Sequence, residues 1–252
     1  MSVEVLLATM NQEDMLFLKK MNIQSDIIIG NQCNRNEVTI LHEKFHIQMY
    51  SFKEKGVGLN RNNSLMRAKA DYCLIADDDM TYVDGYVDLV ERAFKMHSDA
   101  DVIIFNVYGE QQRKCTNTKS YRVNTLNFMR FGAVRIAVKR KSIHLNGIFF
   151  NLTFGGGTEH SNGEDTLFLW ECLRHKLKIY AVPEYIATLN ENSVSTWFRG
   201  YNDKYLKDKG ILYKVMFRKM SRIICLIDAI KYRKRYDRKI LDSLTKLWDT
   251  EI

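Results

Sequence analysis

The sequence lacks most features that mark exported, membrane-spanning or disulfide-bonded proteins. Its 252 residues include a single proline, and no apolar run approaches the roughly 20 residues that a spanning helix requires. The N-terminus has no basic segment followed by a long apolar one, so we expect no signal peptide. The five cysteines are scattered without a Cys-x-x-Cys pair, which argues against a disulfide framework and a structural zinc site. We therefore expect a cytoplasmic protein, at most peripheral on the inner face of the plasma membrane.

Length and composition predict one folded α/β domain with an appendage. Hydrophobic residues make up 46% of the chain and charged residues 27%, which is ordinary for a globular protein. Short apolar runs rich in β-branched residues alternate with helical patterns, and this alternation predicts a mostly parallel sheet flanked by helices. The predicted strands cover residues 3–8, 26–29, 46–52, 72–76, 102–107, 135–138 and 179–182, the last closed by Pro183, and the predicted helices cover 13–21, 60–70, 84–97, 139–145 and 166–175.

Positive charge is confined to the C-terminal tail. The chain has a net charge of +8, yet residues 199–239 alone carry fourteen Lys or Arg against four Asp, so the remainder is slightly acidic. We divide the chain into an α/β domain, residues 1–200, and a basic helical tail, residues 201–252. The spacing within 211–230 predicts a helix with an apolar stripe beside a basic one, which suits either an anionic membrane surface or packing on the parent domain. The stripe contains Leu212, Met216, Met220, Ile223, Ile227 and Ile230, and the basic side contains Lys214, Arg218 and Arg222.

Three consecutive carboxylates follow one of the predicted strands. Asp77, Asp78 and Asp79 come directly after the apolar residues 72–76. Mutual repulsion makes such a triplet unfavourable unless a cation lies beside it, and hard oxygen ligands suit Mg²⁺ or Mn²⁺. A solvated turn is the alternative, but the segment after the triplet is not the Gly, Pro and Ser mixture of an exposed loop. Open α/β sheets bind ligands outside the carboxyl ends of their strands, so we predict a metal–diphosphate site here.

Four segments, in order and spacing, resemble the family 2 glycosyltransferases. They are residues 3–11, 56–62, 74–79 and the Gly163-Glu164-Asp165 sequence. That family has the GT-A fold, a nucleotide-sugar-binding α/β domain with an Asp-x-Asp motif, and inverts the anomeric carbon. The resemblance covers roughly residues 3–200. It implies an α/β fold of GT-A type, with the basic helical tail as an addition.

The resemblance also implies which residues bind the donor. Thr9 and Asn11 follow the first strand, where the family's loop contacts the nucleoside. Asn31 stands where the family has an Asp-rich strand end that holds the base, and an amide can still pair with uracil. Arg61 matches an Ala-Arg-Asn signature beside the nucleotide, where a guanidinium near a helix N-terminus suits a diphosphate. Each of these polar residues can also serve an ordinary structural role at a loop or helix start.

The acidic residues receive roles in metal binding and catalysis from the same resemblance. Asp77 would contact ribose or a metal-bound water, and Asp79 would hold the Mn²⁺ or Mg²⁺ that bridges the two phosphates. Asp78 lies between them in the same donor site. Asp165 would be the catalytic base, because single displacement with inversion needs a proton acceptor on the face opposite the leaving group. Glu164 would hold acceptor hydroxyls or position the loop.

Three further residues are candidates for contacts with the acceptor or a closing loop. His160 precedes the Glu-Asp pair and can contact metal or acceptor, although loop histidines are more often bystanders. Trp197 and Arg199 fall where the family has a mobile loop over donor and acceptor. Aromatic faces stack on sugars and Arg recognises phosphate, but core packing explains Trp197 equally well.

The function implied by the resemblance is metal-dependent, inverting transfer of a sugar from a nucleotide-sugar donor, a UDP-sugar. The acceptor would be a saccharide or lipid-linked saccharide in bacterial surface polysaccharide synthesis. A nucleotidyltransferase with a related sheet is one alternative, but residues 9–13 lack its glycine- and arginine-rich phosphate loop. A nucleic-acid-binding protein that uses the basic tail is another. Because the tail shows no stacking platform and the acidic triplet would repel phosphate without metal, we expect no nucleic-acid partner.

Overall fold

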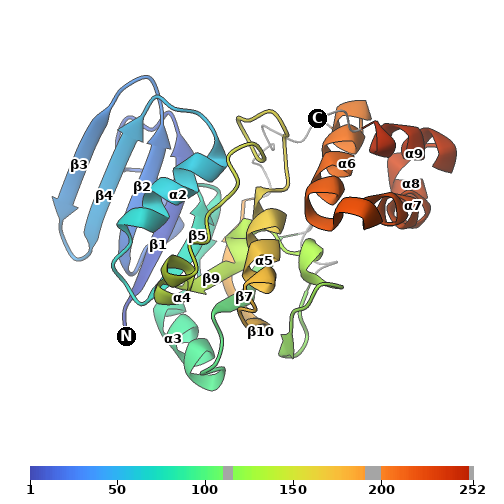
Figure 1. Cartoon of the computed structure of the whole chain (residues 1–252). Coiled ribbons are helices and arrows are strands. Elements are labelled where there is room, and N and C mark those ends of the chain that lie inside the picture. The colour runs from blue at the N-terminus through green and yellow to red at the C-terminus, as the bar shows by residue number, and fades with distance from the viewer. Residues whose placement is uncertain (110–115, 191–199, 250–252) are drawn as a thin grey trace.

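The computed structural model describes residues 1–109, 116–190 and 200–249, and its centre is a mixed sheet (Figure 1). Four strands run parallel in the order β4, β2, β1, β5, followed by the antiparallel β9, by β7 and β10 parallel to each other, and by β6 at one edge. Strand β3 forms the other edge, and β8 pairs with β10. The bounds are β1 (Val3–Met10), β2 (Asp26–Gln32), β3 (Glu37–His42), β4 (His46–Phe52), β5 (Tyr72–Asp77), β6 (Met80–Tyr82), β7 (Val102–Tyr108), β8 (Tyr121–Arg122), β9 (Ile136–Lys139) and β10 (Ile179–Leu189).

Helices cover both faces of this sheet, as the alternating sequence pattern predicts. In β5, Cys73 and Ile75 join one hydrophobic cluster while Leu74 and Ala76 join the other, because successive side chains of a strand point to opposite faces. The first cluster contains residues of α2 (Val57–Arg67), α4 (Arg140–Leu145) and α5 (Glu164–Arg174), and the second contains residues of α1 (Leu18–Met21) and α3 (Tyr86–Met96). The predicted α/β class is confirmed.

Several predicted boundaries differ from the structure. The helix predicted for residues 13–21 is confined to α1, and β10 continues through Pro183 to Leu189. The pairing of β10 with β7 shifts its register between Ala181 and Tyr185, and such irregularities tolerate proline within a sheet. Strands β3 and β6 are absent from the prediction, because β3 is an exposed edge strand without a buried face and β6 has only three residues.

The tail consists of separate helices rather than one continuous amphipathic helix. It contains α6 (Asp203–Phe217), the 3-10 turn η4 (Arg218–Met220), α7 (Ser221–Lys231), α8 (Arg233–Tyr236) and α9 (Ile240–Trp248). Arg218 adopts a left-handed φ of 47°, which ends α6 and divides the predicted stripe. The first two residues of that stripe, Leu212 and Met216, are buried in the first of the two hydrophobic clusters. The remaining four, Met220, Ile223, Ile227 and Ile230, are exposed.

A partly buried lysine joins the tail helices to one another. Lys209 of α6 places its Nζ 2.7 Å from Asp228 Oδ2 of α7 and donates a 2.7 Å hydrogen bond to the Tyr236 hydroxyl of α8. The ring of Tyr232 lies 4.7 Å from the same ammonium group, and three further tyrosine rings surround it. Burial lowers the pKa of Lys209, and Asp228 opposes that effect. Figure 1 shows α6 to α9 grouped beside α5.

None of the helices in the described ranges has the length and apolar character needed to span a bilayer. The four cysteines within those ranges, Cys33, Cys73, Cys172 and Cys225, are free thiols.

We expect Gly210→Ala to destabilise the protein. A Cβ at Gly210 in α6 would lie 2.0 Å from the Leu247 carbonyl oxygen in α9, so the two helices would have to separate. Overpacking of this kind costs about 1–3 kcal/mol, whereas alanine would favour an isolated helix by about 1 kcal/mol. The free energy of unfolding, measured in urea, should therefore fall. An unchanged or increased value would show that α6 and α9 do not pack through this glycine.

Candidate active site

Two buried asparagines fix helix α2 between the strand ends and a neighbouring loop. Asn60 donates hydrogen bonds from Nδ2 to the carbonyl oxygens of Gly30 at 2.8 Å and Thr9 at 3.3 Å, near the carboxyl ends of β2 and β1. A Cβ at Gly30 would lie 1.7 Å from Asn60 Oδ1, so only glycine fits there. Asn62 donates to the Phe150 carbonyl at 2.9 Å and accepts from the Phe150 amide at 2.8 Å. The helix is therefore held on both sides of Arg61.

Arg61 joins the acidic strand end to the start of α5. Its Nη2 lies 2.8 Å from Asp77 Oδ1 and its Nη1 lies 2.7 Å from Glu164 Oε1, while its side chain is only 4% exposed. Burial alone lowers the pKa of Arg61, but the charges of Asp77 and Glu164 raise it above its usual value. The guanidinium is therefore protonated. Its charge-assisted hydrogen bond to Glu164 joins two residues that are 103 positions apart in the chain.

Asp165 lies in the first turn of α5, and the pKa of its carboxyl group is higher than usual. Burial, and then the neighbouring charge of Glu164, raise its pKa from 3.8 to about 7, against the opposing effect of Arg61. The Thr166 amide donates a 2.6 Å hydrogen bond to Oδ1. Gly132 lies beside Oδ2, since a Cβ there would be 3.6 Å away. A carboxylate with a pKa near neutrality is suited to accept a proton from a hydroxyl group.

The three carboxylates of the acidic triplet have different surroundings. Asp77 is paired with the guanidinium described above, and Asp78 accepts a short hydrogen bond from the Thr9 hydroxyl. Asp79 is partly buried, and its carbonyl oxygen accepts a 2.8 Å hydrogen bond from the Asn190 amide of the adjoining strand end. Among the described residues no group of three or more His, Cys, Asp or Glu side chains converges on one point. This donor set fits Mg²⁺ or Mn²⁺, which typically take one or two carboxylates together with substrate phosphates and water.

The glycine-rich segment before α5 packs against both the ion pair and the start of α2. Gly155 has a φ of 101°, and a Cβ on it would lie 2.8 Å from Glu164 Oε2 and 2.6 Å from Val57 Cγ1. The Val57 amide donates a 2.9 Å hydrogen bond to the Gly156 carbonyl. Glycine is required at position 155 because a larger residue would displace Glu164.

The structure gives Asn31 a structural role. It is fully buried, and its Nδ2 donates to the Gln12 carbonyl at 2.8 Å and to the Ser51 hydroxyl at 3.0 Å, while its Oδ1 accepts from the Gln12 amide. The predicted contact of Asn31 with a base would require the loop that carries Gln12 to open. Asn11, by contrast, is exposed after β1 with a left-handed φ of 55° and is accessible to a ligand.

His160 connects the glycine-rich segment to the tail. Its Nδ1 lies 3.2 Å from Asp208 Oδ1 of α6, and its ring packs on Phe154 with a centroid separation of 4.6 Å. The Nδ1 atom of His160 is therefore committed to a carboxylate of the tail, and the contact of this residue with metal or acceptor stays a prediction. Trp197 and Arg199 lie outside the described residues.

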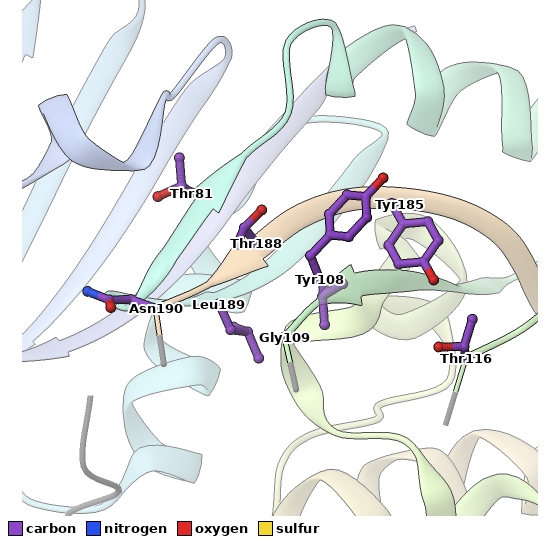
Figure 2. A pocket seen from close by; sticks show the side chains of 9 residues that line it. Thr81, Tyr108, Gly109, Thr116, Tyr185, Thr188, Leu189 and Asn190 are labelled. Carbon is purple, nitrogen blue, oxygen red and sulfur yellow. The ribbon is translucent and has the colours of Figure 1, made fainter. Parts of the chain in front are cut away.

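A cavity of about 620 Å³ is lined by residues of β6, β7 and β10 (Figure 2). Tyr108 of β7 and Tyr185 of β10 stack with their ring centroids 4.1 Å apart, and both line the cavity. Tyr108 is in register with Thr188, which is in register with Thr81, so these three residues share one face of the sheet. Asn190 also lines the cavity and joins it to Asp79 through the hydrogen bond given above. The sequence patterns did not predict this cavity; their only signal was one tyrosine at the end of β7 and another within β10.

Comparison with protein-family models and with curated proteins finds no sequence match. Solved structures of TarS from S. aureus, a GT-A family 2 glycosyltransferase, are similar in fold. The structure of TarS 1–349 with UDP-GlcNAc aligns over 98% of this chain and 90% of its own, with a TM-score of 0.65 and 13% identity. TarS 1–349 with UDP gives a TM-score of 0.59 at 15% identity over 92% of this chain and 72% of its own. A longer TarS structure gives a TM-score of 0.63 at 14% identity, and this chain spans 44% of its length. These likenesses confirm the GT-A fold.

We expect Arg61→Gln to destabilise the protein strongly at neutral pH. Removing one partner of a buried ion pair leaves unpaired charges and typically costs about 3–5 kcal/mol. The loss, measured by urea unfolding, should shrink at acidic pH, because it arises from carboxylate charges left without their guanidinium partner. Arg67→Gln is the matched control, because Arg67 is exposed on the same helix. Equal effects of the two variants, or no dependence on pH, would contradict the central role of Arg61.

Proposed function

We propose that this chain is an inverting, metal-dependent glycosyltransferase that uses a UDP-sugar. The observation that carries the proposal is the pairing of Arg61 with both Asp77 and Glu164. This pairing joins the acidic end of β5, which is suited to a metal-bound diphosphate, to the start of α5. There the carboxyl group of Asp165 has a pKa of about 7. The fold shared with TarS, which has been solved with UDP-GlcNAc and with UDP, supports a nucleotide-sugar donor.

In the proposed reaction the donor lies in the crevice outside the carboxyl ends of β1, β2 and β5. Asp79, with Asp77, would hold Mn²⁺ or Mg²⁺, and the ion would neutralise charge on the departing nucleoside diphosphate. Asp165 accepts the proton of an acceptor hydroxyl as its oxygen bonds to the anomeric carbon and the bond to the diphosphate breaks. Attack from the face opposite the leaving group inverts the anomeric centre. Arg61 orients Asp77 and Glu164 and thereby fixes the position of the acidic strand end relative to Asp165.

The acceptor in this proposal is a saccharide or a lipid-linked saccharide. The cavity beside Asp79 supports that choice, because it combines the stacked rings of Tyr108 and Tyr185 with the hydroxyl groups of Thr81 and Thr188. Aromatic faces and hydroxyl groups together suit the apolar and polar sides of a sugar ring. Strands β7 and β10 run parallel to each other and end at the same edge of the sheet as β5, so an acceptor in the cavity would approach the proposed donor crevice.

Metal-dependent donor binding should require Asp79. Asp79→Asn keeps the shape of the side chain but removes its charge, so UDP-GlcNAc binding measured by calorimetry should lose its enhancement by Mn²⁺, and slow donor hydrolysis should stop. Asp88→Asn is the control, since Asp88 is an exposed carboxylate on α3. Equal affinity of the parent protein for UDP-GlcNAc with and without Mn²⁺ would refute the metal assignment.

Catalysis should depend on the basic form of Asp165. We expect Asp165→Asn to lower kcat by about 100-fold or more, the usual range for loss of a general base, with a nearly unchanged donor Kd. In the parent protein kcat/KM should fall as pH decreases through about 7. Near-normal transfer by the variant would place the base elsewhere, with Glu164 the first alternative.

The same substitution should stabilise the fold at alkaline pH. Because folding raises the pKa of Asp165 from 3.8 to about 7, ionising this group opposes folding progressively as pH rises between those values. Asparagine avoids that ionisation. The melting temperature of Asp165→Asn should therefore exceed that of the parent at pH 8 and match it near pH 4. A difference that is independent of pH would contradict the raised pKa.

A further inference from the structure

Helix α7 presents an apolar face to the outside of the molecule. On its inner side, Cys225 and Ala229 are buried in the first hydrophobic cluster. Its outer side consists of large aliphatic side chains that are 42–56% exposed, namely Ile223, Leu226, Ile227 and Ile230. Met220, in the preceding turn, is 60% exposed. Five large apolar side chains clustered in this way on one surface indicate a contact with another apolar phase.

A basic cavity of about 540 Å³ lies beside this face, between α6, α7 and α9. Four of the described residues that line it are cationic, namely Lys214, Arg218, Lys219 and Arg222, and none of the described lining residues carries a carboxylate. The described lining therefore brings four positively charged side chains together on one side of the tail.

The cavity and the apolar face share one helix. Ser221 and Arg222, at the N-terminus of α7, line the cavity, and Ile223 begins the outward face. The amide groups of a helix N-terminus and nearby guanidinium groups both favour phosphate oxygens. A ligand that satisfies both surfaces combines a phosphate with a hydrocarbon region, which is the chemistry of an anionic phospholipid bilayer.

We propose that α7 docks this protein on an anionic membrane, with a lipid phosphate in the basic cavity and the outward aliphatic side chains in the interface. Charge favours this occupant over a second copy of the chain. Arg222 and Lys231 are exposed on α7, and a symmetric contact through the apolar face would bring the same positive charges together. An anionic surface instead attracts them. This proposal does not depend on which reaction the protein catalyses.

The test is co-sedimentation of the full chain with vesicles. Binding is expected to vesicles of phosphatidylcholine mixed with phosphatidylglycerol, but not to phosphatidylcholine alone, and it should weaken as salt increases. Both Lys219→Gln/Arg222→Gln and Ile223→Ser/Ile227→Ser should weaken binding by about tenfold or more while leaving the melting temperature unchanged. Arg92→Gln/Lys95→Gln on α3 removes the same charges from another exposed surface and should bind like the parent.

Four results would overturn the proposal. Equal losses in the α3 and α7 charge variants would show that only net charge matters. Full binding by Ile223→Ser/Ile227→Ser would show that the apolar face is not in the bilayer. A dimer in solution that this serine variant dissociates, with no vesicle binding by the parent, would assign the face to a second copy. Binding of inorganic phosphate without any binding to vesicles would assign the cavity to a soluble phosphate ligand instead.

Discussion

The candidate site depends on one buried guanidinium shared between two carboxylates. Arg61 connects the end of β5 to the start of α5, and the polar residues on either side of it in α2 hold the helix in place. Glycine at position 155 leaves room for Glu164 against the neighbouring loop. A buried ion pair adds little stability on its own, because desolvation offsets much of the attraction. Its consequence here is geometric: it sets the position of the acidic strand end relative to Asp165.

The two ion pairs of Arg61 also determine how charge is distributed around Asp165. Since Arg61 forms direct ion pairs with Asp77 and Glu164 but not with Asp165, burial and repulsion from Glu164 dominate at the latter residue and raise its pKa. A base with this property works near neutral pH, where an ordinary carboxylate would be weakly basic. The fold tolerates an ionised group in an unfavourable position, which is common where function and stability compete.

Sequence patterns predicted the strands that consist of a continuous buried apolar run, such as β1, β5 and β7. They did not predict β3, whose exposed edge position removes the alternating pattern, or the division of the tail at Arg218. The burial of Asn31 and the pairing of Arg61 with Glu164 also could not be predicted, because both depend on contacts between distant segments. The roles of metal, donor and acceptor stay predictions, since the fold likeness supports only the architecture.

The most direct test is the titration of the Asp165 carboxyl group by carbon NMR, with its resonance assigned by comparison with Asp165→Asn. The account predicts a midpoint near pH 7, since burial and Glu164 raise the pKa of this group to about 7 while Arg61 is held by Asp77 and Glu164. A midpoint near the ordinary value of 3.8 would show that Asp165 is solvated or paired with a cation, and would contradict the proposed division of charge around Arg61.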